Sequence, residues 1–386
     1  MSKKILNIVG ARPNFMKIAP IMAAFGRYPG LVARLLHTGQ HYDAAMKQSF
    51  FDQLGIPEPD IDLGVGSGSH ALQTAEIMRR FEPVLDAEQP DAVLVVGDVN
   101  STIACALVAV KKGIPVIHVE AGLRSNDRAM PEEINRVLTD QISDLLFITE
   151  RSALANLQRE GIAERRVHFV GNVMIDTLRN HLDRAVPPAN TLANIPQPEI
   201  FKTGYGILTL HRPSNVDDTD VLRGLLQSLA AISAELPIVF PVHPRTRARI
   251  ESAGLASLVN TPRFVLTPPL GYLEMLGLMA EAKAVFTDSG GIQEETTSLG
   301  VPCITLRENT ERPITVEQGT NTVVGTDPQR IRAAWNEIAR TGGKAGRVPE
   351  LWDGQSASRI AVIVETWLAA RTSLSSVESR QANFAG

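Results

Sequence analysis

Residues 92–112 read AVLVVGDVNSTIACALVAVKK, a charge-free run of strand length followed, after Gly97 and Asp98, by apolar residues at helical spacing. Further apolar runs in the first half of the chain lie at 5–9, 31–37, 115–120, 144–149 and 167–171, with a helix-like stretch at 13–25. Ser101 or Thr102 is suited to cap the helix that follows the run at 92–98. Strands that alternate with helices are typical of βαβ units, which form a parallel sheet covered by helices on both faces. We therefore expect a doubly wound α/β domain.

The second half repeats this pattern after a proline-rich connection. Prolines stand at 187, 188, 196 and 198 in a segment with few periodic apolar residues, which is typical of a linker. Apolar runs then recur at 206–211, 237–243, 264–267, 284–289, 303–307 and 322–325. They predict a second doubly wound sheet, so we expect two Rossmann-like domains that face each other across a cleft. A last helix is expected near 356–370, followed by a Ser-rich tail that frays.

The composition excludes several classes of protein. The 386 residues include 38 Lys and Arg against 42 Asp and Glu, so neither disorder nor a global attraction to nucleic acid is expected. Cys105 and Cys303 lie inside apolar runs, which indicates buried free thiols in a reducing compartment. Arg12 interrupts the first apolar run before a signal-peptide core can form, and no other run approaches the roughly 18 apolar residues of a membrane span. We expect a cytoplasmic protein that does not bind membranes.

Polar residues gather directly after the predicted strands, where ligands bind in open α/β sheets. In the first half three carboxylates take such positions, namely Asp98, Glu120 and Glu132. Carboxylates that are brought together raise one another's pKa, which suits acid–base chemistry, so we interpret them as a catalytic set. Helix capping is the alternative interpretation for Asp98 and for Glu132 with Glu133, but it explains Glu120 least well.

In the second half the segment DSGGIQEE (288–295) predicts an anion site. Its glycines let the backbone approach a ligand closely, and the N–H groups at a helix start would attract a diphosphate. Glu294 or Glu295 would then accept hydrogen bonds from ribose hydroxyls. There is a structural alternative for each feature. The turn could simply place Ser289 as a helix cap, and the glutamates could complement the helix dipole.

Cationic and imidazole side chains near the strand ends are candidates for contacts with phosphate or sugar. They are Arg12, Lys17, Arg212, Arg245, Arg312, His211 and His243. Taken singly, Lys17 and Arg245 are equally well explained as solvated surface residues. The chain has no C-x-x-C spacing, and we expect no metal site.

Taken together, these segments resemble the non-hydrolysing UDP-N-acetylglucosamine 2-epimerase family. The matching motifs extend over most of residues 8–325 and are, in order, GARPNFMKIAP, TGQHYD, VGDVNST, HVEAGLRS, MPEEINR, TLHRPSNVDD, PVHPRT, TDSGGIQEETTSLGVP and NTERPITVEQGTN. The resemblance implies a glycosyltransferase-B-like α/β fold, with domains at 1–177 and 178–357 and a C-terminal helix at about 358–386 that packs back on the first domain. It also implies a homodimer.

The resemblance further implies a reaction and the residues that perform it. The family interconverts UDP-GlcNAc and UDP-ManNAc by eliminating UDP to leave 2-acetamidoglucal, then adding UDP and a proton back on the opposite face, without a cofactor. Asp98, Glu120 and Glu132 would be the acid–base set, and His211 a further catalytic residue. The residues expected to bind substrate are Arg12, Lys17, Gln40, His41, Arg136, Arg212, His243, Ser289, Gly290, Gly291, Glu295 and Arg312. Arg136 would support the acid–base set from the helix of Glu132. Gln40, His41, Arg212 and His243 also lie where some relatives bind UDP-GlcNAc as an activator.

Asn14, Val99 and the pair Pro213-Ser214 depart from the commonest family pattern. These departures leave the sugar open, because relatives act on UDP-linked 2-acetamido sugars modified at C3 or C6. Three other functions are alternatives: a glycosyltransferase of the same architecture, a hydrolysing epimerase that releases ManNAc, and a nucleotide-sugar sensor without activity.

Overall fold

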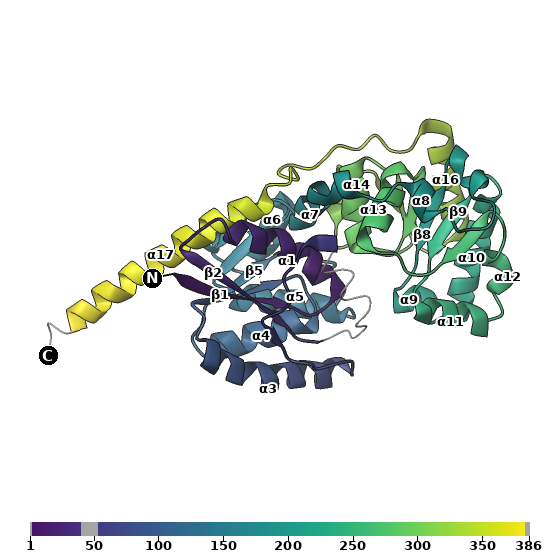
Figure 1. The fold of residues 1–386 in the computed structure, drawn as a ribbon. Coiled ribbons are helices and arrows are strands. Elements are labelled where there is room, and N and C mark those ends of the chain that lie inside the picture. Colours follow the sequence, from purple (N-terminus) through teal and green to yellow (C-terminus); the bar gives the residue numbers. More distant parts are fainter. Residues whose placement is uncertain (1, 40–52, 383–386) are drawn as a thin grey trace. The chain divides into compact units, whose positions relative to one another are not determined.

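The computed structural model describes residues 2–39 and 53–382, except for the side chains of Arg12 and of residues 372–382. The chain divides into two compact units. Unit 1 comprises Met1–Thr177 and Glu350–Gly386, and unit 2 comprises Leu178–Pro349. Each unit is built around its own parallel sheet with alternating helices, so the predicted α/β class is confirmed (Figure 1).

Unit 1 contains a sheet of seven described strands in the order β3-β2-β1-β4-β5-β6-β7, all parallel. The strands are β1 (Lys3–Val9), β2 (Leu31–His37), β3 (Ile61–Asp62), β4 (Ala92–Val96), β5 (Val116–Val119), β6 (Leu145–Ile148) and β7 (Val167–Phe169). The chain builds the sheet in one direction from β1 to β3 and in the other from β4 to β7. The strand order therefore reverses between β1 and β4.

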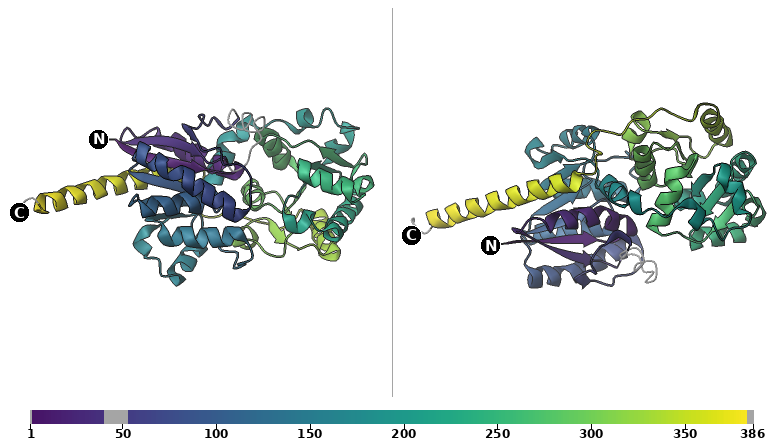
Figure 2. Two further views of the ribbon diagram at one scale, coloured as in Figure 1. Left: turned by 90° about the horizontal axis from the view of Figure 1, so that it is seen from below. Right: turned by 45° about the horizontal axis from the view of Figure 1, so that its top comes forward.

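Helices cover both faces of this sheet (Figure 2). They are α1 (Arg12–Phe25), α3 (His70–Glu88), α4 (Asn100–Lys111), α5 (Pro131–Ile142), α6 (Arg151–Arg159), α7 (Val173–His181), in which the boundary between the units falls, and α17 (Ser356–Ala382), with the short η1 (Glu164–Arg166). All five residues of β4 are buried, and its Val93 and Val95 pack with Ile77 and Phe81 of α3. Burial on both faces explains why this strand is a continuous apolar run.

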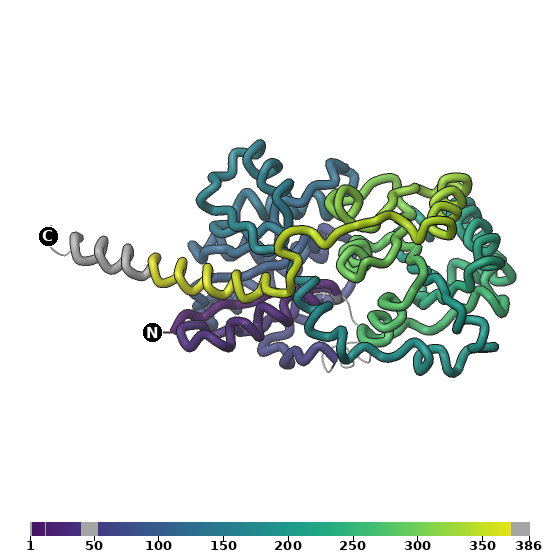
Figure 3. Tube along the Cα trace, turned by 90° about the horizontal axis from the view of Figure 1, so that it is seen from above, coloured from purple at the N-terminus to yellow at the C-terminus, as the bar shows by residue number. Residues whose placement is uncertain are grey.

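Two local predictions for unit 1 are wrong. Helix α4 begins at Asn100 with Val99 at its N-cap, because the hydroxyls suited to capping bond elsewhere. Ser101 Oγ lies 2.7 Å from Thr38 Oγ1, and Thr102 Oγ1 donates to the Val96 carbonyl at 3.1 Å. The last helix does not end near residue 370 but continues to Ala382, and its first part lies beside α1 (Figure 3).

Unit 2 contains six described parallel strands in the order β10-β9-β8-β11-β12-β13. They are β8 (Gly206–Thr209), β9 (Ile238–Pro241), β10 (Phe264–Thr267), β11 (Ala284–Thr287), β12 (Cys303–Thr305) and β13 (Asn321–Val323). The helices are η2 (Leu182–Arg184), α8 (Pro188–Thr191), η3 (Pro198–Thr203), α9 (Pro213–Val216), α10 (Thr219–Ser233), α11 (Pro244–Ser252), α12 (Ala256–Val259), α13 (Tyr272–Glu281), α14 (Gly290–Leu299), α15 (Pro313–Glu317) and α16 (Pro328–Thr341). The strand order reverses between β8 and β11, so both units have the Rossmann arrangement with one switch point each.

The core of unit 2 has a layer on each face of its sheet. Leu208, Phe240 and Phe286 pack with residues of α10 and α16, whereas Ile207 and Val285 pack with residues of α13. Cys105 and Cys303 are buried and free, as predicted. Within the described part of the chain, no helix is long and apolar enough to span a membrane.

Candidate active site

The switch point of unit 1 is held by Asn14, in the first turn of α1. Its Oδ1 accepts hydrogen bonds from the backbone N–H groups of Gly10 (3.2 Å) and Ala11 (2.9 Å). Its Nδ2 donates to the Val96 carbonyl at 2.9 Å. A single buried amide therefore joins the carboxyl end of β1 to that of β4, where open α/β sheets bind their ligands.

A buried ion pair lies at the same place. Lys17 of α1 contacts Glu120, the residue that follows β5, and both side chains are less than a tenth exposed. Glu120 has a positive φ of 72°, which is strained for a residue with a side chain and typical of functional sites. A Cβ at Gly97 would lie 3.3 Å from Lys17 Nζ and 3.6 Å from Glu120 Oε2. The pair is therefore packed against the glycine that precedes Asp98.

The other two predicted carboxylates differ in their surroundings. Asp98 forms an ion pair with Arg136 of α5, whose Nη1 also lies 2.7 Å from Glu133 Oε2. Glu132, in the first turn of the same helix, is half-buried and has no hydrogen-bond or ion-pair partner among the described residues. The structure thus places Asp98 and Glu120 on adjoining strand ends. Arg136, predicted both to bind substrate and to support the acid–base set, contacts two carboxylates of the protein itself.

Neither Asp98 nor Glu132 acts as the helix cap of the alternative interpretation. Val99 and Met130 occupy the N-cap positions of α4 and α5, and neither helix has a side-chain cap. Glu133 instead accepts hydrogen bonds from the backbone N–H groups of Ser125 and Asn126, both at 2.9 Å.

A buried polar network adjoins these residues and was not predicted from the sequence. His118 of β5 lies 2.7 Å from Asp140 Oδ1 and 2.8 Å from the Gly97 carbonyl oxygen. Arg124 bridges Asp140 and Glu160 through contacts of 2.7 and 2.6 Å. Burial raises the pKa of Asp140, but His118 and Arg124 lower it more, so its pKa lies below the ordinary value. A histidine inside an otherwise apolar strand was the available signal for this network.

Asp288 is the central residue of the switch point of unit 2. This fully buried carboxylate follows β11 and accepts hydrogen bonds from the backbone N–H groups of His211 (3.0 Å) and Arg212 (2.9 Å), which follow β8. His211 Nδ1 also lies 2.8 Å from Asp288 Oδ1. Burial raises the pKa of Asp288, but these contacts, led by the His211 ring, hold it below the ordinary value. The His211 ring is thereby fixed at the strand end with 53% of its side chain exposed.

The Ser-Gly-Gly turn leads directly into α14, which begins at Gly290. Ser289 holds the N-cap position but makes no side-chain cap bond, so the plain capping interpretation is wrong. Glu294 and Glu295 lie beyond the first turn, which excludes the dipole interpretation. Tyr272 donates its hydroxyl to Glu295 Oε1 at 3.0 Å, and Arg312 Nε lies 2.7 Å from Glu294 Oε1.

Three arginines surround a buried glutamate at this end of α14. Glu311 lies 2.8 Å from Arg307 and 3.4 Å from Arg212, and the charge of the adjacent Arg312 acts on it too. Burial raises the pKa of Glu311, but Arg312 and Arg307 outweigh burial and hold it well below its ordinary range. A Cβ at Gly290 would lie 2.8 Å from Glu311 Oε1, so a larger residue at this position would force the Glu311 side chain to move. Three arginines, which can bind phosphate oxygens, therefore lie near the amino end of α14, and their charges are offset in part by Glu294 and Glu311.

The remaining predicted site residues have the following positions. Arg12 begins α1, but its side chain, like Gln40 and His41, lies outside the described part of the structure. Gly291 is the second residue of α14. His243 is the N-cap of α11, where its Nδ1 accepts a hydrogen bond from the Arg245 backbone. Arg245 is an exposed partner of Asp217, which favours the surface interpretation for this arginine.

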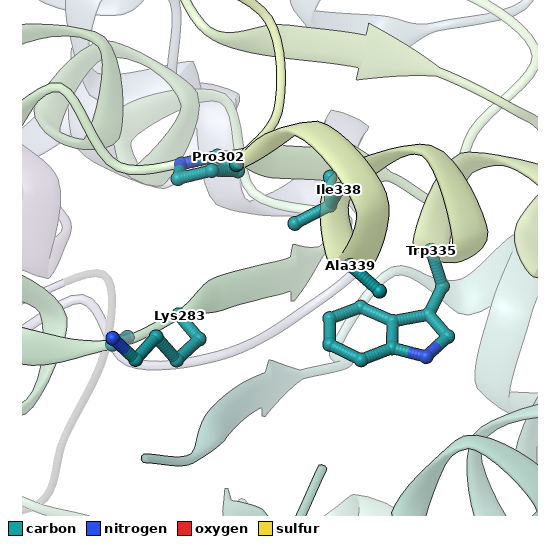
Figure 4. Close-up of a pocket in the computed structure, with 7 residues that line it drawn as sticks. Lys283, Pro302, Trp335, Ile338 and Ala339 are labelled. Atoms are coloured by element: carbon teal, nitrogen blue, oxygen red, sulfur yellow. The ribbon is translucent and has the colours of Figure 1, made fainter. Parts of the chain in front are cut away.

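A cavity of about 490 Å³ lies in unit 2 away from these residues (Figure 4). Its lining includes Lys283, Pro302, Trp335, Ile338 and Ala339. Lys283 precedes β11 and Pro302 precedes β12, so the cavity adjoins the amino ends of the strands, the opposite edge of the sheet from Asp288.

Comparison with known proteins identifies relatives over nearly the whole chain. The family model for UDP-N-acetylglucosamine 2-epimerase matches residues 23–365. A UDP-N-acetylglucosamine 2-epimerase of Methanococcus maripaludis is 44% identical over 85% of this chain and 89% of the relative. A UDP-2,3-diacetamido-2,3-dideoxy-D-glucuronate 2-epimerase of Pseudomonas aeruginosa is 41% identical over 93% and 98%. The crystal structure of the Methanocaldococcus jannaschii UDP-GlcNAc 2-epimerase in complex with UDP-GlcNAc and UDP covers 94% of this chain and 99% of its own, with 40% identity and a TM-score of 0.82.

Proposed function

This chain belongs to the UDP-N-acetylglucosamine 2-epimerase family of isomerases, and from this premise we propose that it interconverts UDP-GlcNAc and UDP-ManNAc. A base removes the proton from C2 while the C1–O bond breaks and its electron pair leaves with UDP. The intermediate is 2-acetamidoglucal. Addition of UDP to C1 and of a proton to the opposite face of C2 completes the inversion, so the reaction is redox-neutral and needs no oxidant or reductant.

Residues of unit 2 suit the binding of UDP. Arg212 and Arg312 lie at the amino end of α14, where Gly290 lets the backbone approach a ligand. As the C1–O bond breaks, negative charge develops on the departing diphosphate, and fixed cations and helix N–H groups stabilise that charge. Glu295, oriented by Tyr272, is assigned to the ribose hydroxyls.

Residues of unit 1 suit the proton transfers. The observation that carries this assignment is that Asp98 and Glu120, on adjoining strand ends, are each held by a cation from a helix. Groups that exchange a proton with carbon need a fixed position, and the ion pairs with helix cations supply it for Asp98 and Glu120. Glu132 is the third member of the set. We assign Lys17 and Arg136 to the positioning of these carboxylates.

A second substrate has specific support, because the 41% identical relative is named for a 2,3-diacetamido glucuronate sugar. The main proposal is therefore the reaction, epimerisation at C2 of a UDP-linked 2-acetamido sugar, and UDP-GlcNAc as the substrate is the further part of it. The homodimer, the activating second UDP-GlcNAc site and the cytoplasmic location remain predictions from the sequence.

The test is a panel of UDP-linked 2-acetamido sugars, each incubated with the protein and followed by chromatography of the nucleotide sugars. With UDP-GlcNAc we expect a mixture of UDP-GlcNAc and UDP-ManNAc at equilibrium, and no free sugar. Release of free ManNAc would support hydrolysis instead, and loss of the sugar only with an added acceptor would support a transferase. If only the 2,3-diacetamido glucuronate sugar reacts, the second substrate is the correct one.

A further inference from the structure

The surroundings of His118 determine the charge of its ring. The side chain is fully buried in β5, with Nδ1 2.7 Å from Asp140 Oδ1 and Nε2 2.8 Å from the Gly97 carbonyl oxygen. A carbonyl oxygen only accepts hydrogen bonds, and so does an ionised carboxylate. A neutral ring has one N–H group, so one of its nitrogens would direct a lone pair at an acceptor.

Asp140 is in the ionised form. Its Oδ2 accepts hydrogen bonds from the Gly122 backbone N–H at 3.0 Å and from Arg124 Nη2 at 2.7 Å. Burial raises the pKa of Asp140, and the Arg124 guanidinium acts in the opposite direction. Both nitrogens of His118 therefore face acceptors.

We propose that His118 is a buried imidazolium that positions two carboxylates of the active site. The ring contacts the carbonyl of Gly97, which directly precedes Asp98, and lies two residues before Glu120 in the chain. A single side chain thus joins the ends of β4 and β5 at their carboxyl edge. A charge-assisted hydrogen bond to the Gly97 carbonyl is about twice as strong as a neutral one, which suits it to hold that loop.

The charge is tested on the wild-type protein by ¹⁵N NMR of labelled histidine rings at neutral pH. We expect both ring nitrogens of His118 to give signals of protonated nitrogen. The signals are identified by their loss in His118→Gln or, if that variant does not accumulate, by through-bond correlation to the His118 Cβ. An unprotonated ring nitrogen at His118 would overturn the proposal.

The positioning role rests on the proposed function and is tested by kinetics. In His118→Gln we expect kcat for proton exchange at C2 to fall about 10- to 100-fold, as when a reacting group is displaced slightly, with UDP affinity changed less than about twofold. His168→Gln, a half-buried histidine of β7, is the matched control and should change neither. An unchanged kcat in His118→Gln, or a parallel loss of UDP binding, would refute the role. If the wild type catalyses no exchange at C2, the proposed function fails, and the NMR result on the ring charge stands independently.

Discussion

Replacing Lys17 by Met tests whether the buried ion pair organises the switch point of unit 1. The side chains of Lys17 and Glu120 are 9% and 5% exposed, so the change removes the cation that faces a buried carboxylate. Breaking one partner of a buried pair costs about 3–5 kcal/mol of unfolding free energy, because the other charge is left in a poorly solvated place. The pKa of Glu120 should rise in response, since the cation that favours its charged form is gone.

Lys3→Met is the matched control, because Lys3 forms an ion pair with Asp91 in the same sheet at 25% and 33% side-chain exposure. This pair is more accessible to water than that of Lys17 and Glu120, so we expect it to contribute less, about 1 kcal/mol. The assay is urea unfolding read by amide hydrogen exchange in β1 and β4, which reports the free energy of this unit alone. The double variant Lys17→Met with Glu120→Gln should recover much of the loss, because no buried charge remains. Equal losses for Lys17→Met and Lys3→Met would refute the reasoning.

Further predictions concern the acids and the anion site. Asp98→Asn and Glu120→Gln should abolish exchange at C2 while UDP still binds in calorimetry; normal turnover would show that their roles are misassigned. Arg312→Ala should mainly weaken UDP binding, by about 2 kcal/mol, and unchanged affinity would remove it from the site. The pKa of Asp288 lies below its ordinary value, so its contribution to the stability of unit 2 is complete above the unfolded pKa of about 3.9 and is lost as the pH falls through the folded pKa. When the urea midpoint of unfolding is measured as a function of pH, Asp288→Asn should therefore reduce its fall at acid pH. A fall as steep as that of the wild type would contradict this.

Particular elements show which parts of the fold the sequence could predict. The strands β4 and β11 are continuous apolar runs because helices cover both faces of each sheet, and such runs are visible in one sequence. Most strand ends were predicted one or two residues too long; β4, for example, ends at Val96, whereas the run was taken to continue through Gly97 and Asp98. The two-residue strand β3 carries no pattern and was not predicted. The Ser-rich part of α17 continues the helix where composition alone favoured fraying.

In the candidate site, too, some residues could be predicted from the sequence and others could not. Asp98 and Glu120 were predicted because a polar residue after a buried strand is recognisable from its place in the chain. Most of their partners were not predicted, because which side chains meet depends on tertiary packing. Arg136 was expected to support the acid–base set as well as to bind substrate, and its contact with Asp98 agrees with the first of these expectations. The pair of His118 with Asp140, 22 residues apart, is invisible in a linear pattern.

The most direct measurement of the account is the reaction in deuterium oxide, with the C2 position of the sugar followed by proton NMR. If carboxylates of unit 1 remove and return this proton while UDP departs, the UDP-ManNAc formed carries deuterium at C2, and the recovered UDP-GlcNAc acquires it as well. Formation of UDP-ManNAc with the original hydrogen still at C2 would contradict the elimination.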